Sequence, residues 1–273
     1  MPAQITPESF EKFVQERRYL HNVSDNTEQI YRAAWAKWQK HGPDPVGFVS
    51  GMREGGMNAT GCNIYIRSMN AFFNWGGNPP IRKLKEEEKV PPTFSPSDVQ
   101  KLLRYKPRSS EKRIYTLILL LLDTGVRINE ALSLQKPDVD FDNLLLLVKG
   151  KGRKERMVPF SLELRKHLWK HLADHAHGFV FSSRDGKKLL YRNVIRAVKV
   201  LCIGAGIKPP RRLLHSFRHT FAITYIRNGG SVFHLQRALG HSTLDMSRRY
   251  ANLTTDDLIQ MQQKVSVLQA ASR

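Results

Sequence analysis

The stretch LLHSFRHTFAITYIRNGGSVFHLQRALGHSTLDMSRRYAN, residues 213–252, decides the fold and the chemistry that the rest of the sequence has to support. It contains His215, Arg218, His241 and Tyr250. Arginine and histidine can hold and neutralise phosphate oxygens, and a tyrosine oxygen can attack phosphorus to form a covalent intermediate. This set is poorly suited to peptide hydrolysis or hydride transfer. It favours transesterification at a phosphodiester.

Glycines divide this stretch into short helices. Residues 215–228 predict a helix that stops at Gly229 and Gly230, and Ser231 is placed to cap a second helix that ends at Gly240. Two further helices are expected at 244–250 and at 255–268. The last of these is amphipathic, which is consistent with packing on its own domain and equally with docking on a neighbouring molecule.

Upstream, the pattern changes from helical to strand-like. Apolar runs at 144–148 and 156–160 flank a glycine-containing loop, which predicts a β-hairpin. A short strand is expected at 179–182, and helices at 161–173 and 192–203. The hairpin tip is strongly basic and carries Lys149, Lys151, Arg153 and Lys154.

A buried helix precedes the hairpin. Residues 111–122 are apolar almost all round, as expected at the centre of a domain. Gly125 then turns the chain into a new helix, with Arg127 at its start and Glu130 three residues later. The sequence SPSD at 95–98 is a strong helix start, with Ser95 or Ser97 as the cap, and marks the beginning of this domain.

The first 80 residues predict a small helical bundle. Helices are expected at 6–19, from a cap at Asp25 or Asn26 to about His41, at 46–52 and at 58–75, where Ile64 and Ile66 are among the expected core residues. Aromatic residues at helical spacing are assigned to its core. Residues 81–94 contain blocks of charge and two prolines and predict a linker to the second domain, residues 95–273. The fold class is therefore mainly α with a small antiparallel sheet.

The charge of the chain points to a polyanionic partner. The formal net charge is +20. Residues 1–90 carry 12 basic and 10 acidic side chains, whereas residues 91–273 carry 32 and 14. The positive excess therefore lies with the candidate chemistry, which favours nucleic acid as the partner. Surface charge for solubility is the alternative explanation.

Other sequence features narrow the class of protein. The longest apolar run, 117–122, is too short to span a bilayer, and the first residues show no signal peptide, so a cytoplasmic location is expected. Cys62 and Cys202 stand alone and far apart, which disfavours a disulfide framework or a zinc site. His215 and His219 have a metal-ligand spacing on a helix, but no third ligand is near, so no metal or cofactor is expected and His219 is assigned to packing.

Five ordered segments, TGVRINEALSL, KGKGRKERMVP, HSFRH, LGHST and SRRYAN, resemble the sequence boxes of the tyrosine recombinase, or phage integrase, family. The first domain resembles the family's helical, SAM-like core-binding domain in size and position. The resemblance covers the whole second domain and implies the α+β catalytic fold of that family. The layout is similar to simple Xer-like recombinases, which lack the arm-binding domain of longer integrases.

The resemblance implies six catalytic residues and one supporting acid. They are Arg127, Lys151, His215, Arg218, His241 and the nucleophile Tyr250, with Glu130 in support. Arg127, Arg218 and His241 would hold the phosphate, His215 would act as base and Lys151 as acid. Additional phosphate contacts are expected from Lys149, Arg153, Lys154, Arg211 and Arg212.

The implied function is site-specific recombination of double-stranded DNA. The family works as four protomers in the synapse and proceeds through a Holliday junction without metal or ATP, and the free protein can be a monomer. A nucleoid-associated protein of a prokaryote, virus or mobile element is expected. A type IB topoisomerase, a helix-turn-helix reader at 231–250 and a catalytically silent DNA-binding regulator are the alternatives.

Overall fold

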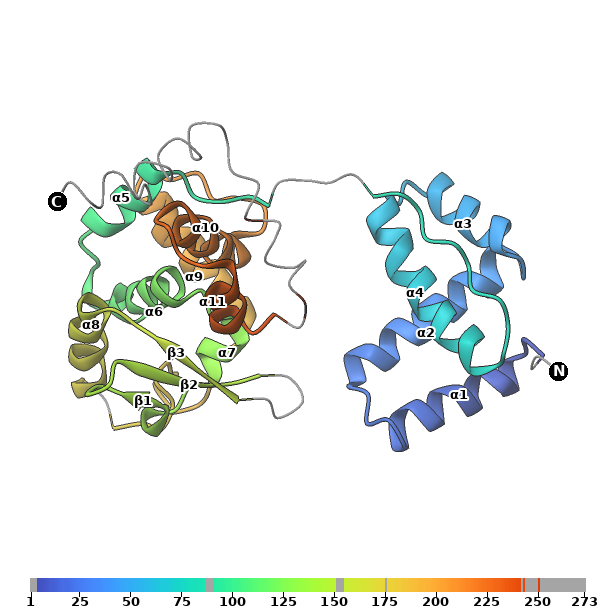
Figure 1. Cartoon of the computed structure of the whole chain (residues 1–273), viewed down its shortest axis with the longest axis horizontal. Coiled ribbons are helices and arrows are strands. Elements are labelled where there is room, and N and C mark those ends of the chain that lie inside the picture. Colours follow the sequence, from blue (N-terminus) through green and yellow to red (C-terminus); the bar gives the residue numbers. More distant parts are fainter. Residues whose placement is uncertain are drawn as a thin grey trace, which may run out of the picture. The chain divides into compact units, whose positions relative to one another are not determined.

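The computed structural model describes residues 4–86, 91–150, 155–174, 176–241, 243 and 250 (Figure 1). The chain divides into two compact units, residues 1–89 and 90–273. Among the helices described, none combines the length and the apolar composition that crossing a bilayer requires. The predicted helices at 244–250 and 255–268 lie outside the described residues, except for Tyr250.

The described residues of the first unit form four helices, as the sequence predicts. They are α1 (Pro7–Tyr19), α2 (Asp25–His41), α3 (Pro45–Glu54) and α4 (Ala59–Trp75). Each begins at a residue whose side chain accepts a hydrogen bond from a free backbone N–H of the first turn. These caps are Thr6, Ser24, Asp44 and Asn58. The cap of the second helix is therefore Ser24, not Asp25 or Asn26 as predicted.

Aromatic rings form the core of this unit. Phe72 lies between Phe10 and Phe13, with ring centroids 5.4 and 5.5 Å away. The assignment of these aromatics to the core is confirmed. Ile64, also predicted as core, is 44% exposed. It lies two residues before the buried Ile66, and two residues on a helix are about 200° apart, so the two side chains point to opposite faces.

Residues 76–86 return along α4 and are fastened to it by two asparagines. Asn70 accepts from the backbone N–H of Ile81 at 2.7 Å and donates to its carbonyl at 2.8 Å. Asn63 makes the same pair of bonds with Leu84, both at 2.9 Å. The first part of the segment assigned to the linker thus packs on the first unit.

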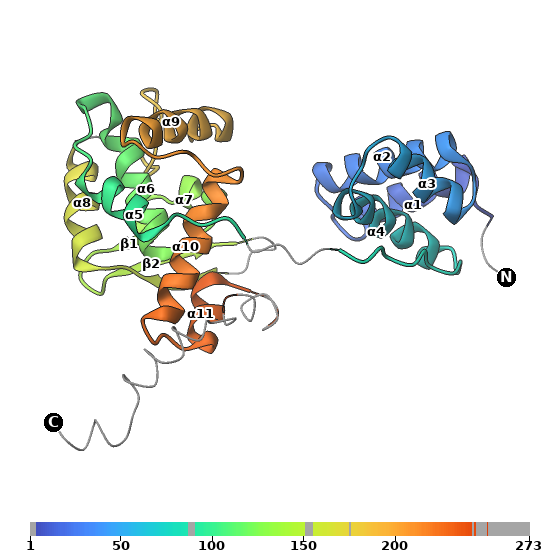
Figure 2. The same ribbon diagram turned by 90° about the horizontal axis from the view of Figure 1, so that it is seen from above.

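The second unit surrounds the buried helix α6 (Lys112–Thr124). Before it lies α5 (Pro96–Arg104), capped by Ser95, one of the two serines of SPSD expected as its cap. After it come α7 (Ile128–Ser133), α8 (Leu162–Ala173), α9 (Tyr191–Gly204), α10 (Leu213–Arg227) and α11 (Val232–Leu239). Figure 2 shows α10 between α9 and α11, and α10 also packs against α6.

A three-stranded antiparallel sheet lies beside these helices, in the order β1 (Val139–Asp140), β2 (Leu145–Lys149) and β3 (Glu155–Pro159). The predicted hairpin is confirmed, with its register running from Leu145 opposite Pro159 to Lys149 opposite Glu155. The strand predicted at 179–182 is wrong. Phe179 and Ser182 form isolated bridges to two separate segments, so no continuous ladder develops.

Candidate active site

Arg218 joins three parts of the second unit. It lies on α10, is 8% exposed, and its Nη1 donates to the carbonyl of Gly125 at 2.8 Å. Its Nη2 donates to the carbonyl of Leu239 at 2.6 Å. Burial, helped by the nearby charge of Arg127, lowers the pKa of Arg218 to about 10. The guanidinium therefore stays charged at neutral pH, and the backbone fixes its direction.

Gly125 terminates α6 and makes the turn that presents Arg127. Its φ of +62° is left-handed, a region that favours glycine. A Cβ atom here would overlap the ring of Phe221 and lie 2.9 Å from the side chain of Leu239. The turn therefore requires glycine for its conformation and for the close approach of α10 and α11.

We expect Gly125→Ala to lower the free energy of unfolding by about 2–3 kcal/mol, because left-handed strain and overpacking add. Thermal unfolding of the full chain measures this. Gly206, which also has a positive φ but open space around it, provides the control Gly206→Ala. Its loss should be smaller, about 1 kcal/mol, since only the backbone strain applies. Equal losses in the two variants would contradict the packing argument.

Arg127 and Glu130 cap α7 and face one another. The Glu130 carboxylate accepts from the backbone N–H of Arg127 at 2.8 Å and from its Nη1 at 2.9 Å. The Arg127 side chain is 45% exposed, whereas that of Glu130 is 7% exposed. Burial alone would raise the pKa of Glu130, but hydrogen bonds from Arg156 and Arg127 outweigh it and the pKa is lowered. Glu130 is therefore a buried anion that supports an accessible arginine.

Arg156 was not singled out from the sequence. It lies on β3, and its guanidinium donates to both oxygens of Glu130, at 3.0 and 2.8 Å. Its Nε donates to the carbonyl of Ala238 at 2.9 Å. The carboxylate of Glu130 is thus shared by two arginines.

His241 follows the end of α11. Gly240 adopts a φ of +62°, and the His241 N–H donates to the carbonyl of Gln236 at 3.1 Å. Burial, followed by the charges of Arg218 and Arg127, lowers the pKa of His241 to about 4. The imidazole is therefore neutral at neutral pH and can donate one hydrogen bond without carrying charge.

Tyr250 is 7% exposed and packs with α10 and α11. Its phenol oxygen is 2.7 Å from Nδ1 of His219. Its ring is parallel to that of His241 within 15°, with the centroids 6.5 Å apart. The assignment of His219 to packing is therefore incomplete, because this imidazole contacts the phenol oxygen itself.

His215, the predicted base, lies one helical turn before His219 on the exposed side of α10. Partial burial of its ring lowers its pKa, and the charges of Arg212 and Arg218 act in the same direction. It is therefore mostly neutral and able to accept a proton at neutral pH. The structure brings His215, Arg218 and Arg127 within electrostatic reach of one another.

The predicted basic residues of the hairpin are only partly described. Lys151, Arg153 and Lys154 lie outside the described residues. Lys149, at the end of β2, donates to Asp138 at 2.8 Å, and this bond raises the pKa of the lysine.

Two more predicted phosphate contacts, Arg211 and Arg212, are exposed immediately before α10. Within the part of the chain that the structure describes, no group of three or more histidine, cysteine or acidic residues could hold a metal ion.

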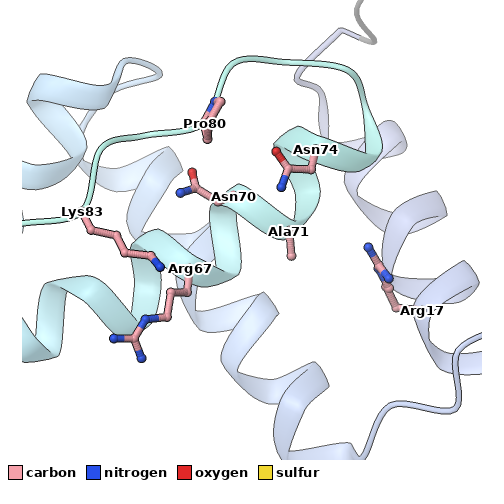
Figure 3. A pocket seen from close by; sticks show the side chains of 7 residues that line it. All are labelled: Arg17, Arg67, Asn70, Ala71, Asn74, Pro80 and Lys83. Carbon is pink, nitrogen blue, oxygen red and sulfur yellow. The ribbon is translucent and has the colours of Figure 1, made fainter. Parts of the chain in front are cut away.

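The first unit carries a basic cavity of about 400 Å³ (Figure 3). Arg17 of α1, Arg67 of α4 and Lys83 of the returning segment line it. Arg67 is paired with Glu86 at 3.3 Å. The asparagines 70 and 74 complete its polar lining. The mixture of cations and amides is suited to an anionic ligand.

The described part of the catalytic unit therefore contains side chains suited to binding an anion. The accessible Arg127 and the buried Arg218 lie near His241, since burial and the charges of these two arginines lower the pKa of the imidazole. A phenol is stacked beside that imidazole. Two cations and one neutral donor beside a phenol suit a phosphodiester that is attacked by a tyrosine oxygen.

Comparisons with known proteins identify the family to which the sequence is similar. The family model described as Phage integrase family matches residues 92–256. Tyrosine recombinase XerA of Pyrococcus furiosus is 28% identical over 265 residues, covering 92% of this chain and 91% of the relative. The XerA of Saccharolobus solfataricus is 33% identical over 199 residues, covering 71% of this chain and 64% of that protein.

Two solved structures share the fold. The Tn1549 transposon integrase in complex with a circular intermediate DNA has a TM-score of 0.75 and 19% identity, over 94% of this chain and 99% of that one. XerH site-specific recombinase bound to its difH substrate has a TM-score of 0.70 and 21% identity, over 97% of this chain and 86% of that one. The family match covers more than half of the sequence. The chain therefore belongs to the phage integrase family of tyrosine recombinases.

Proposed function

We propose that this protein recombines double-stranded DNA at specific sites by way of a 3′-phosphotyrosine intermediate formed on Tyr250. The observation that carries the proposal is the grouping of Tyr250, His241, Arg218 and Arg127 at the meeting of α6, α7, α10 and α11. Each of these side chains has the chemistry that the step at phosphorus needs.

The first step is attack on the scissile phosphodiester. The Tyr250 oxygen bonds to phosphorus while the bond to the 5′ oxygen breaks. Charge that develops on the non-bridging oxygens is stabilised by Arg127, Arg218 and the N–H of His241. The phenol has to lose its proton, since its ordinary pKa is about 10. His215 is the proposed base, and His219 is the imidazole that contacts the phenol oxygen in this structure.

The second step is rejoining. A free 5′ hydroxyl of another strand attacks the phosphotyrosine and releases Tyr250. The bond energy is kept in the protein–DNA link, so no nucleotide cofactor is needed. Exchange of two pairs of strands through a Holliday junction requires four active sites, and we propose a tetramer on DNA. The protein would act in the cytoplasm, at the DNA of its host or of a mobile element.

The experiment that tests this proposal uses a duplex selected for tight binding to the full chain. The protein is mixed with that duplex and with a supercoiled plasmid that carries two copies of it, without metal or nucleotide. We expect a covalent adduct on a denaturing gel, with the DNA attached to the peptide that contains Tyr250, and recombined circles from the plasmid. Relaxed circles without recombined ones would indicate a type IB topoisomerase activity. Tight binding without any adduct would indicate a silent DNA-binding protein.

Lys151 is proposed to protonate the departing 5′ oxygen. We expect Lys151→Ala to slow adduct formation by about 100-fold or more on normal DNA. A 5′-thio leaving group has an ordinary pKa of about 8.5 and departs with little need for an acid, so its cleavage should be nearly unchanged. Single-turnover rates on the two substrates make the measurement. Equal slowing on both would remove Lys151 from the role of acid.

The basic cavity of the first unit is proposed to contact the DNA backbone. Substituting both Arg67 and Lys83 with alanine should weaken DNA binding by about tenfold and reduce the slope of log affinity against log salt by about 2, because two phosphate contacts are lost. Titrations of a duplex at several salt concentrations measure both quantities. The control replaces Lys12 and Lys40, two exposed lysines outside the cavity, with alanine. The proposal would be wrong if both pairs changed the slope equally.

A further inference from the structure

The carboxylate of Glu130 is the buried link between two arginines from different elements. Arg156 of β3 donates to both of its oxygens, at 3.0 and 2.8 Å. Arg127 donates to one of them from its side chain at 2.9 Å. The Arg156 side chain is 15% exposed against 45% for Arg127. Arg156 is therefore the inner partner of Glu130, and Arg127 is the one that an external anion can reach.

Arg156 also holds the end of α11. Its Nε donates to the carbonyl of Ala238 at 2.9 Å, and the next carbonyl, that of Leu239, accepts from Arg218 at 2.6 Å. Two successive carbonyls at this helix end are thus bound by arginines from β3 and α10. A Cβ on Gly240 would lie 3.1 Å from three atoms of the Arg156 side chain. The turn that presents His241 is packed directly on Arg156.

The charges at this place have a definite balance. Arg127, Arg156 and Arg218 contribute three positive charges and Glu130 one negative charge, so the net charge is +2. Without Arg156, the whole charge of Glu130 would fall on Arg127, and the net charge would be +1. A buried carboxylate with a single cationic partner binds it strongly and keeps it from other anions.

We propose that Arg156 is a positioning residue of the active site. It neutralises Glu130 so that the charge of Arg127 is available to the scissile phosphate, while its hydrogen bond to Ala238 holds it in place against the end of α11. The inference rests on the proposed function, because it takes Arg127 and Arg218 as phosphate ligands. Its consequence is that phosphate binding depends on the charge balance between Arg156 and Glu130.

The test measures inorganic phosphate binding to the DNA-free full chain. Arginine Nε–Hε resonances of ¹⁵N-labelled protein are followed during phosphate titration. Arg156→Met removes the charge, and Glu130→Gln combined with Arg156→Met restores the net charge of +2. Arg156→Lys keeps the charge but cannot donate to Glu130 and Ala238 in the same planar arrangement. Together these variants separate the charge of Arg156 from its geometry.

We expect Arg156→Met to weaken phosphate binding by about tenfold or more, because Arg127 would pair with Glu130 and its charge-assisted contact with phosphate would be lost. The double variant and Arg156→Lys should bind within about threefold of the wild type. If Arg156 only supports the fold, the double variant will bind no better than Arg156→Met, and that result would overturn the inference. So would a wild-type protein that shows no phosphate shift of Arg127.

The same variants keep this inference separate from the proposed function. If Arg156→Met does not fold, the double variant and Arg156→Lys still test whether phosphate binding depends on the charge balance. Both should fold, because neither leaves the charge of Glu130 buried without a partner. The wild type could form no adduct on Tyr250 while the phosphate affinities of the wild type and its variants follow the predicted order. That result would contradict the recombinase proposal and still support the role of Arg156 in the charge balance. On a selected duplex, Arg156→Met should form adduct about 100-fold more slowly at saturating DNA, while its affinity for DNA changes by less than about threefold.

Discussion

Tyr250→Phe is expected to abolish the covalent protein–DNA adduct and to leave DNA binding nearly unchanged. The substitution removes only the oxygen that would attack phosphorus, so the rate of adduct formation should fall by about four orders of magnitude or more. The ring is buried among apolar side chains of α10 and α11, where phenylalanine fits equally well. Loss of the hydrogen bond with His219 should cost about 1 kcal/mol of stability.

The matched control is Tyr225→Phe. Tyr225 lies on α10 and packs against the same small apolar cluster, so it tests the removal of a phenol oxygen from this region. Its adduct formation should equal that of the wild type. Denaturing gels give the adduct, and gel-shift titrations give the affinity. Strand cutting that persists in Tyr250→Phe would mean that another residue is the nucleophile.

Local sequence pattern predicted most of the fold and many of its boundaries. The buried helix α6, the start of α5 at the SPSD sequence and the pairing of β2 with β3 in a hairpin all follow from residues that are close together in the chain. Apolar periodicity and turn chemistry act locally, so the sequence contains them directly. The error at Ile64 arose because an apolar residue was assigned to the core without regard to its face of the helix.

Contacts between distant residues could not be predicted in this way. Arg156 looks like one more cation of a basic hairpin, and its burial depends on Glu130, 26 residues earlier, and on Ala238, 82 residues later. His219 shares a helix with His215, and which of them contacts Tyr250 depends on where the chain returns 31 residues later.

The packing of residues 76–86 on α4 was not predicted for a similar reason. The side-chain amides of Asn70 and Asn63 on α4 hydrogen-bond the backbone of Ile81 and Leu84, as a neighbouring strand would do. Asparagine in a helix is not a distinctive sequence signal, so composition alone predicted a linker from residue 81. A fold class is encoded by local pattern, whereas a polar side chain that bridges two elements is recognised only once both are placed.

Arg218→Lys is expected to have the second largest effect, and to change both activity and stability. A lysine ammonium cannot replace the planar fork that binds the carbonyls of Gly125 and Leu239 and still present a donor to phosphate. Adduct formation should fall by about 1000-fold, the size of effect seen when a preorganised charge-stabilising donor is removed. Two buried carbonyls would lose their partners, which lowers the free energy of unfolding by about 2–4 kcal/mol.

Arg127→Lys separates these two effects. Arg127 is proposed to bind the same phosphate, but its side chain is 45% exposed and its side-chain hydrogen bond goes to Glu130, not to the backbone. Arg127→Lys should therefore lose activity by a similar factor with a loss of stability below about 1 kcal/mol, because the lysine keeps the positive charge beside Glu130 and Arg156 still pairs with that carboxylate. Thermal unfolding and single-turnover cleavage of both variants make the comparison. Equal destabilisation in the two would show that the buried carbonyl contacts of Arg218 do not support the fold. Full activity in Arg218→Lys would show that a point charge is enough at this position.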